Sequence, residues 1–430
     1  MKMSANKNTD IKAELLKYDK AVDKMYWFFL GFILVYEILG STPFLYYLME
    51  WYIGLFSEKT VGLAAACFQG IMNLRFLIIL PAIYNIILKS ETIKEKLILS
   101  AMLLLGWYYA FRMREQNDTY IFRDMAMIVA SYRKDYRKIF RTMILLAGSI
   151  MAFTVVMNLL GVIPEWPLER DGQIRHSFGT LGPTNLAGHI GFALMAYMYI
   201  KDGRIKWPAY VVIIILSVLN LVYVDGRTAF LSVFLGSVGC LVYTAFHKMQ
   251  WKVPERMLKL WRGFLLSAYP VASGVFLFWV FTYSTDPNIF YNKFHILYSL
   301  QGRIANPNRI MGVTGITPFG NYYEHYWVAG NTFKNTGNYE FLDSSYARVL
   351  LMYGWVAFLL ILGLLIFAQI RLYKQKKTFQ MFILAVLSLH FLMEHHILEP
   401  AYNIFLLLPF AGYGEAKEEK KNNSSGESKR

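Results

Sequence analysis

Long apolar runs recur along this chain from residue 25 to residue 413, and they constrain its fold more than any other feature. A helix needs about 20 apolar residues to cross the hydrocarbon core of a bilayer, and many of these runs are that long. The composition agrees, because 56% of the residues are hydrophobic and only 17% are charged, whereas soluble domains carry about 25% charged residues. The sequence therefore predicts an all-α polytopic membrane protein.

We expect about twelve transmembrane helices, because shorter tilted spans can cross a bilayer alongside the longer ones. The expected spans are residues 25–47, 61–88, 97–111, 120–132, 143–163, 186–200, 209–224, 229–246, 264–283, 346–370, 379–392 and 401–413. The span at 120–132 is the weakest, since it is short and contains Arg123 and Asp124.

The basic residues gather in the short segments between the apolar runs. The formal net charge of +15 could indicate a nucleic-acid partner, but the positive-inside rule describes this placement for cytoplasmic loops. Keeping the span at 120–132 puts the basic segment YRKDYRKIFR, residues 132–141, on the cytoplasmic side with the other basic loops. We therefore predict a multi-pass protein of the cytoplasmic (inner) cell membrane, with both termini cytoplasmic and no nucleic-acid partner.

The chain divides by composition into three parts. Residues 1–24 form a polar cytoplasmic segment that is too long for a cleavable signal peptide, residues 25–413 form the membrane domain, and residues 414–430 form a disordered cytoplasmic tail. Two expected extracytoplasmic loops, 164–182 and 285–342, are longer than simple connections, and long loops are often functional. We find no convincing internal repeat, which argues against transporter folds built from duplicated halves.

Three arginines stand in glycine-containing segments on the expected outer side. They are Arg175, which is followed by His176, Arg227 in VDGRTAF, and Arg303 in LQGRIANPNRI. Each of them alone could reach to lipid headgroups. As a set they favour a phosphate or diphosphate ligand, because a guanidinium offers rigid bidentate donors.

The segment DSSY, residues 343–346, follows the longer loop and precedes an apolar run. An Asp or Ser at this place is typical of a helix N-cap, which accepts a hydrogen bond from a free backbone N–H. One capping residue suffices, so either Asp343 or Ser344 remains available for chemistry. Both interpretations stay open on the sequence.

Other residues are weaker candidates. Glu37 and Arg75 lie in early spans, where ionisable side chains usually pair, and we consider that they pair with each other. His189 is either a packed core residue or a site residue. Cys67 and Cys240 lie in apolar runs, so we expect buried free thiols rather than a disulfide.

The segment MEHHILEP contains Glu394, His395, His396 and Glu399, a composition that suggests metal ligation. Because neighbouring residues of a helix point apart, however, we expect no metal site here. Neither a phosphate-binding loop nor the dinucleotide glycine pattern occurs in the sequence, so nothing indicates nucleotide-driven chemistry.

Five segments of the chain, in order, resemble a known family. They are RHSFGTLGPTNLAG, DGRTAFL, GRI followed by ITPFGNYY, LDSSYARVLLMYGW and EHHILEPAYNIFLLLPF. In these segments the chain is similar to Wzy-type O-antigen polymerases of the O-antigen ligase/polymerase family, most closely to those of Gram-positive capsule and exopolysaccharide systems. The similarity extends from the span at 143–163 to the end of the chain, and the first hundred residues match only in hydropathy.

The chain also departs from the pattern of the family at two places. Ligases often carry a histidine where this chain has Asp343, and an aspartate is closer to the polymerase pattern. Many relatives have His-Pro-Asn-Thr where this chain has GPTN at 182–185, which weakens a specific role for Asn185.

The resemblance implies a C-type glycosyltransferase (GT-C) fold with its active site on the outer face of the cytoplasmic membrane. Such an enzyme extends a surface polysaccharide by transferring glycan from undecaprenyl diphosphate, or a similar polyprenyl diphosphate, to a new lipid-linked repeat unit. It inverts the anomeric centre and needs neither a metal ion nor a cofactor. The expected partners are the lipid-linked glycan donor and acceptor, membrane lipid, a chain-length regulator and a flippase.

The resemblance also implies roles for individual residues. The functional arginines of the family correspond to Arg175, Arg227 and Arg303. Arg227 and Arg303 would stabilise charge on the leaving diphosphate, with Arg175 as a third member or a glycan anchor, and Asp343 would orient or deprotonate the acceptor hydroxyl. The expected substrate-binding residues are His176, Asn185, Ser344, Tyr346 and Glu399. Two alternatives remain: an O-antigen-type ligase with another acceptor, and a polysaccharide flippase or other transporter.

Overall fold

The computed structural model describes residues 17–55, 60–113, 120–170, 172–250, 253–284, 286, 301–321 and 341–412. Most of the expected N-terminal segment 1–24, the expected tail 414–430 and much of the expected loop 285–342 lie outside the described residues. The described part is mostly helical, as the sequence predicts. It divides into two compact units: Met1–Ala193 with Val222–Asp225 and Glu399–Arg430, and Leu194–Leu221 with Gly226–Leu398.

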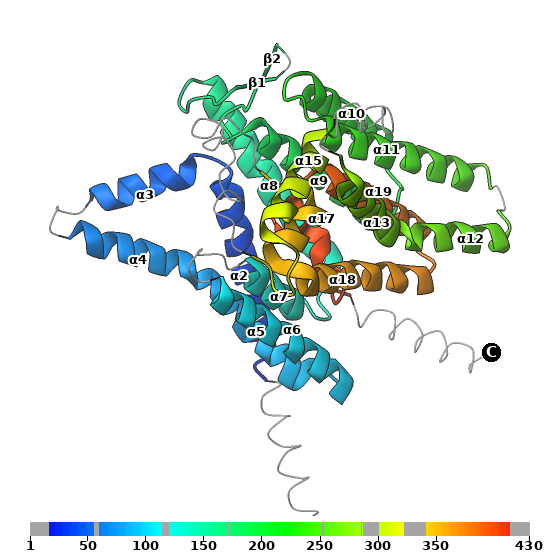
Figure 1. The fold of residues 1–430 in the computed structure, drawn as a ribbon, viewed down its shortest axis with the longest axis horizontal. Helices are drawn as coiled ribbons and strands as arrows, with labels where there is room; N and C mark the ends of the chain where they lie inside the picture. The colour runs from blue at the N-terminus through cyan, green and yellow to red at the C-terminus, as the bar shows by residue number, and fades with distance from the viewer. Residues whose placement is uncertain are drawn as a thin grey trace, which may run out of the picture. The chain divides into compact units, whose positions relative to one another are not determined.

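The first unit is built around the short helix α7. Its helices are α2 (Asp19–Gly40), α3 (Phe44–Gly54), α4 (Val61–Asn73), η1 (Leu74–Ile78), α5 (Ile79–Tyr84), η2 (Asn85–Lys89), α6 (Ile93–Arg112), α7 (Tyr120–Ala130), α8 (Tyr136–Leu159) and η8 (Ile404–Leu407), and its strands are β1 (Leu168–Arg170) and β2 (Gln173–Arg175). Helices α5 and α6 pack against α7 (Figure 1), and nearly every residue of α7 is buried.

The second unit is built around helix α19. Its helices are α10 (Trp207–Val222), α11 (Arg227–Lys248), α12 (Glu255–Leu266), α13 (Ala268–Thr282), α15 (Gln301–Thr314), α17 (Ser345–Arg348), η6 (Val349–Tyr353), α18 (Gly354–Lys374), α19 (Thr378–Met393) and η7 (His396–Leu398), and α9 (Pro183–Ile200) has residues in both units. Helices α11, α12, α13 and α18 pack against α19, most of which is buried.

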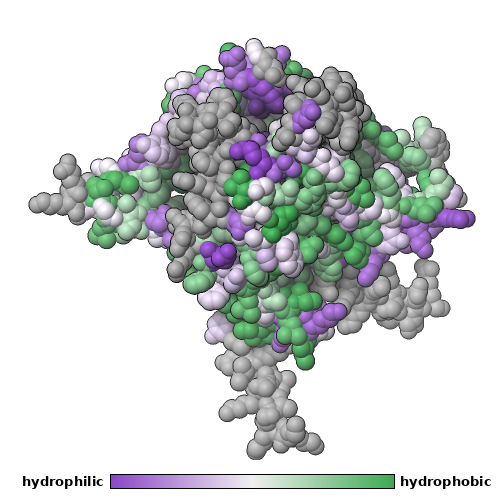
Figure 2. Space-filling model, viewed as in Figure 1, coloured by the Kyte–Doolittle hydropathy of each residue, from purple (hydrophilic) through white to green (hydrophobic). Residues whose placement is uncertain are grey.

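Several helices have the length and composition of membrane spans. Four segments qualify among the described residues: Val61–Lys89, Tyr136–Leu159, Arg227–Phe246 and Ser345–Lys374. Two bent pairs raise the number to six if each pair is one span, namely α2 with α3, bent by 98°, and α12 with α13, bent by 41°. Large apolar side chains are exposed on these helices, for example Leu63 (68%) and Phe264 (66%), and hydrophobic residues cover much of the visible surface (Figure 2). Such exposure suits a lipid environment.

Two of the expected spans are not single continuous helices in the structure. The span at 25–47 is interrupted, because α2 ends at Gly40 and Pro43, which lacks a backbone N–H, immediately precedes α3. The hydroxyls of Ser41 and Thr42 donate to the carbonyls of Ile38 and Leu39 and so satisfy the end of α2. The expected span 401–413 is not a long helix: its described residues form turns and η8, and they are buried within the first unit. The apolar side chains of this run therefore pack against the rest of the first unit.

The expected weak span at 120–132 is a helix, but a short one. Helix α7 has 11 residues, which at 1.5 Å per residue give about 16 Å, roughly half the thickness of the hydrocarbon core. Its charged residues are buried with partners in the first unit. The topology that depends on this span remains a prediction.

The two long loops contain secondary structure that the sequence did not suggest. The loop 164–182 carries the antiparallel β1–β2 hairpin, and the loop 285–342 carries α15. Both cysteines are free, as expected, and Cys240 is buried, but Cys67 is exposed on α4, so its expected burial is wrong. A cysteine in an apolar helix is exposed in this way when it lies on the side of the helix that would face lipid.

Candidate functional site

Three segments that are distant in the sequence meet in the second unit at the end of α19. Arg303 on α15 donates from Nε to the carbonyl of Met393 (3.0 Å), and its Nη2 lies 4.0 Å from Oε1 of Glu394. Ser345, the first residue of α17, donates to the carbonyl of Glu394 from its backbone N–H (3.2 Å) and from its hydroxyl (2.5 Å). The hydroxyl of Ser345 also accepts a hydrogen bond from the backbone N–H of Ile397 (3.2 Å). We call this group the α19-end site.

The local structure follows from where α19 stops. Glu394 has extended backbone angles (φ −129°, ψ 147°), and its N–H donates to the carbonyl of His390, which completes the last turn of α19. The carbonyl of Glu394 then has no helical partner, and a buried carbonyl without a hydrogen bond is costly. Ser345 supplies that bond, so the start of α17 and the end of α19 stabilise each other.

The segment 343–346 is placed beside this site, but its residues have different roles. Asp343 is half-buried, whereas Ser344, Ser345 and Tyr346 are almost fully buried. Ser344 occupies the N-cap position of α17 without making a side-chain capping bond, and its hydroxyl lies 3.3 Å from the carbonyl of Phe391. The Tyr346 hydroxyl donates to the carbonyl of Ser388 (2.9 Å). Because Ser344 and Tyr346 contact the backbone of α19, they position the segment, and their burial leaves them no surface for a sugar.

Arg227 is the first residue of α11, is exposed, and belongs to the same unit. Close to it, the hydroxyl of Ser232 lies 2.9 Å from Nδ1 of His390 on α19, and His390 also contacts the backbone of Thr228. The start of α11 is therefore held against the second half of α19. His390 is a site neighbour that the sequence reasoning missed, although a histidine inside an otherwise apolar helix was a signal for it.

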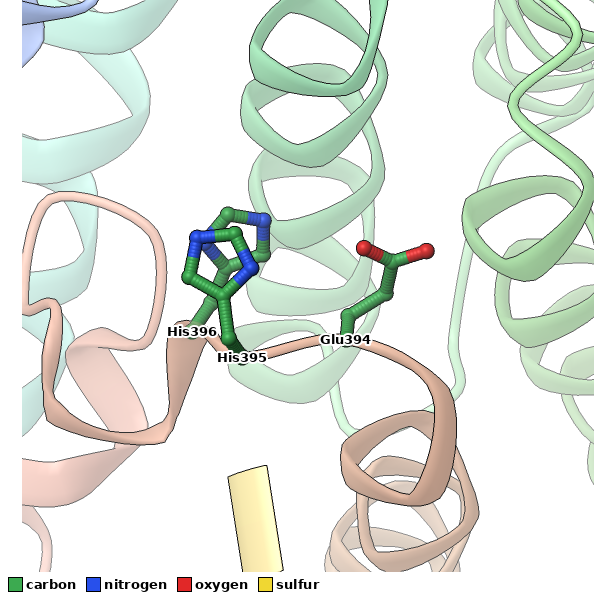
Figure 3. Close-up of side chains that lie close together, drawn as sticks. All are labelled: Glu394, His395 and His396. Carbon is green, nitrogen blue, oxygen red and sulfur yellow. The ribbon is translucent and has the colours of Figure 1, made fainter. Parts of the chain in front are cut away.

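Glu394, His395 and His396 form a compact cluster at the α19-end site (Figure 3). One ligand-type atom from each of the three side chains lies within 4.8 Å of the others. The centroids of the two imidazole rings lie 4.3 Å apart. The His395 ring packs edge to face with the ring of Phe341, with centroids 4.8 Å apart. We expected these residues to point apart because we assumed that they lie on one helix. That assumption was wrong, because α19 ends at Met393.

Two other expected site residues, Arg175 and His176, lie in the first unit. Arg175, at the end of β2, donates from Nε to the carbonyl of Val224 (3.2 Å), and its Nε lies 3.7 Å from Oδ2 of Asp225. Nδ1 of the adjacent His176 lies 3.0 Å from Oε1 of Glu165. Both side chains therefore have protein partners that hold the hairpin.

Asn185 and Glu399 belong to a second polar group in the first unit. Oδ1 of Asn185 accepts a hydrogen bond from the hydroxyl of Tyr402 (3.3 Å), and the Tyr402 ring stacks on His189 (centroids 3.9 Å apart). Nε2 of His189 lies 3.0 Å from the hydroxyl of Ser41. The carbonyl of Glu399 accepts from the backbone N–H of Tyr402 (2.9 Å). His189 is thus a packed residue within a polar network.

The same unit contains a buried ion network. Arg123 on α7 pairs with Glu37 on α2 and with Asp124 (Nη2 to Oδ1, 2.8 Å), and Arg123 is only 3% exposed. Glu37 also accepts a hydrogen bond from the backbone N–H of Ala401 (3.0 Å). The expected pairing of Glu37 with Arg75 is wrong, because the guanidinium of Arg75 instead lies over the ring of Tyr36, 4.4 Å from its centroid.

No model of a known protein family matches this chain, and no curated protein or solved structure matches it either.

Proposed function

We propose that this protein is a glycosyltransferase that polymerises polyprenyl-diphosphate-linked oligosaccharide repeat units on the outer face of the cytoplasmic membrane. The observation that carries the proposal is the α19-end site, where Arg303, Ser345 and Glu394 are in contact. These residues come from three of the five segments that resemble O-antigen polymerases. A basic group beside a partly exposed carboxylate, here Arg303 beside Glu394, suits binding and transfer of a group from a lipid diphosphate.

The arginines supply the charge for the leaving diphosphate. The bond from Nε of Arg303 to Met393 fixes the plane of the guanidinium, so its remaining N–H groups have a set direction. A fixed guanidinium can bind two phosphate oxygens at once and stabilises the negative charge that develops as the glycosidic bond breaks. Arg227 is exposed at the start of α11 and serves as the second cation.

Asp343 acts on the acceptor. In the proposed step the acceptor hydroxyl oxygen bonds to the anomeric carbon of the donor, the bond from that carbon to the diphosphate breaks, and the hydroxyl proton passes to the Asp343 carboxylate. Asp343 is half-buried and directly precedes two serines that bind the backbone of α19. These bonds hold the backbone beside Asp343, and a carboxylate on an ordered backbone can orient the hydroxyl as well as accept its proton.

The proposal includes the GT-C fold and a larger number of spans than four to six. Helices α6, α9, α10 and α19 are apolar but shorter or more charged than the qualifying segments, and in the proposal they cross the membrane as tilted or protein-packed spans. The mostly helical architecture with several candidate spans supports this part of the proposal.

The test uses purified full-length protein and a polyprenyl-diphosphate-linked repeat unit. We expect a ladder of lipid-linked oligomers, and we expect Arg303→Ala, Arg227→Ala and Asp343→Asn each to reduce ladder formation by about 10²–10⁴-fold. Arg309→Ala is the matched control, because Arg309 is an exposed arginine on the same helix as Arg303.

The outcomes separate the alternatives. Transfer of glycan to a different acceptor without a ladder would identify a ligase, and movement of the lipid across vesicles without turnover would identify a transporter. Normal ladders from all three site variants would refute the assignment of these residues.

A further inference from the structure

We infer that Glu394, His395 and His396 form a binding site for a divalent transition-metal ion of the Zn²⁺ type. Such a site would bind its ion whether or not the protein transfers glycans. In the cluster of Figure 3, one carboxylate and two imidazoles bring ligand-type atoms within 4.8 Å of one another.

The spacing is close to what one ion requires. Zinc binds imidazole nitrogen and carboxylate oxygen at about 2.0–2.2 Å, so ligand atoms around one tetrahedral ion lie roughly 3.3–3.6 Å apart. The ligand atoms of the cluster therefore need to approach by roughly 1 Å, which rotation of the Glu394 and His395 side chains can supply. Both of these side chains are half-buried and therefore partly open to solvent, whereas His396 is buried.

The backbone that presents the ligands is already held in place. The carbonyl of Glu394 accepts two hydrogen bonds from Ser345, and the N–H of Ile397 donates to the same serine. The ring of His395 lies against the edge of Phe341. Because the fold orders this segment in advance, binding an ion does not have to order it, and preorganisation of this kind increases affinity.

The donor set indicates the class of ion. Two imidazole nitrogens and one carboxylate oxygen suit Zn²⁺ and its neighbours in the first transition row, whereas Mg²⁺ and Ca²⁺ prefer oxygen ligands. Three protein ligands also leave at least one coordination position open, as in zinc sites that bind water or an anion. The open position would accept a water molecule or a phosphate oxygen.

Arg303 provides a distinctive test of the site. Its Nη2 lies 4.0 Å from Oε1 of Glu394, so a bound cation would be placed close to a guanidinium of the same sign. The second carboxylate oxygen can still bind the ion, but repulsion lowers the affinity. Removing the positive charge of Arg303 should therefore strengthen metal binding, a result that adventitious binding to surface histidines would not give.

The experiment titrates Zn²⁺ into tag-free, chelator-stripped full-length protein in detergent and follows binding by calorimetry, with Co²⁺ absorption as a second readout. We expect about one equivalent to bind. We expect Glu394→Gln and His395→Ala to weaken binding by at least about 10-fold and Arg303→Gln to strengthen it roughly 3- to 10-fold. His176→Ala is the matched control, since His176 also lies beside a carboxylate, Glu165, in the first unit, and it should leave the affinity unchanged.

Two results would overturn the inference. One is the absence of saturable binding to the unaltered protein, and the other is binding that neither Glu394→Gln nor Arg303→Gln changes. Circular dichroism of each variant shows whether it is folded, and Glu394→Gln also keeps the size and shape of the side chain. If the unaltered protein binds the metal but forms no oligosaccharide ladder from the lipid-linked repeat unit, the proposed function alone is refuted.

Discussion

Ser345 shows how a single residue can organise a site that is assembled from distant segments. Its backbone and hydroxyl make two hydrogen bonds to the carbonyl of Glu394, and its hydroxyl accepts a third from Ile397. The side chain is completely buried, so water cannot replace these bonds. Neighbouring Ser344 is also a buried serine, yet its hydroxyl makes one long hydrogen bond, of 3.3 Å, to the carbonyl of Phe391.

We predict that Ser345→Ala lowers the free energy of unfolding by about 1–3 kcal/mol, because it leaves the buried N–H of Ile397 without its acceptor. Ser344→Ala should cost clearly less. Thermal unfolding of the two purified variants, compared with the unaltered protein, measures the difference. Equal destabilisation by both substitutions would contradict the special role of Ser345.

At the scale of elements, the buried pair of Arg123 and Glu37 joins α7 to α2. Asp124 shares the same guanidinium, and Glu37 extends the network to the backbone of Ala401. A charged group without a partner in this environment is far more costly than a neutral one. The packing of α7 in the middle of the first unit therefore depends on Arg123.

We predict that Arg123→Met destabilises the protein by about 3–5 kcal/mol, because it leaves the buried carboxylates without their cation. Arg112→Met, at the exposed end of α6, is the matched control and should have little effect. The triple variant Arg123→Met, Glu37→Gln, Asp124→Asn should regain part of the lost stability. If the triple variant regains no stability, the destabilisation by Arg123→Met comes from the lost shape of the side chain and not from its lost charge.

At the scale of the whole molecule, the proposed function depends on how the candidate spans are oriented in the membrane. Helix α8 is one of the four segments that qualify as spans, and its first turns carry Arg137, Lys138 and Arg141. The positive-inside rule places such an end in the cytoplasm. The hairpin that follows α8 would then lie outside, on the side proposed for glycosyl transfer.

We predict that a cysteine in place of Ile174, an exposed residue of β2, reacts with an impermeant maleimide in intact cells. Cysteines in place of the exposed residues Lys138 and Lys259 should react only after the membrane is permeabilised. The experiment first replaces Cys67 and Cys240 by alanine, since both are free thiols. Labelling of Lys138→Cys in intact cells would show that α8 has the opposite orientation, and it would contradict the topology in which α7 crosses the membrane from a cytoplasmic N-terminus.

Much of the helical content could be predicted from the apolar runs, but the environment of each run could not. The run at 401–413 has the same composition as a span, yet its described residues form turns and η8, which are buried in protein. Cys67 lies in a run of the same kind, yet it is exposed on α4. Hydropathy measures only the preference for leaving water, so it does not separate contact with lipid from contact with protein.

The sequence predicted which residues carry chemistry at the candidate site, but it did not predict which of them lie next to one another. Arg303 drew notice as an arginine in a glycine-containing segment, Asp343 as a polar residue before an apolar run, and Glu394 through the two histidines beside it. Their arrangement depends on α19 ending at Met393, where the helical geometry assumed for His395 and His396 stops applying. Glu37 was correctly expected to have a cation as a partner, but the partner is Arg123.

The sequence by itself determined that this is a mostly helical protein with segments long and apolar enough to span a membrane. The reason is local: periodicity, apolar length and charge placement are properties of neighbouring residues. Only the tertiary structure decided that Ser345 binds the end of α19, that Glu394 lies between Arg303 and two histidines, and that Arg123 joins two helices. Those contacts depend on which surfaces pack together, and side-chain pairing between distant segments is a result of that packing.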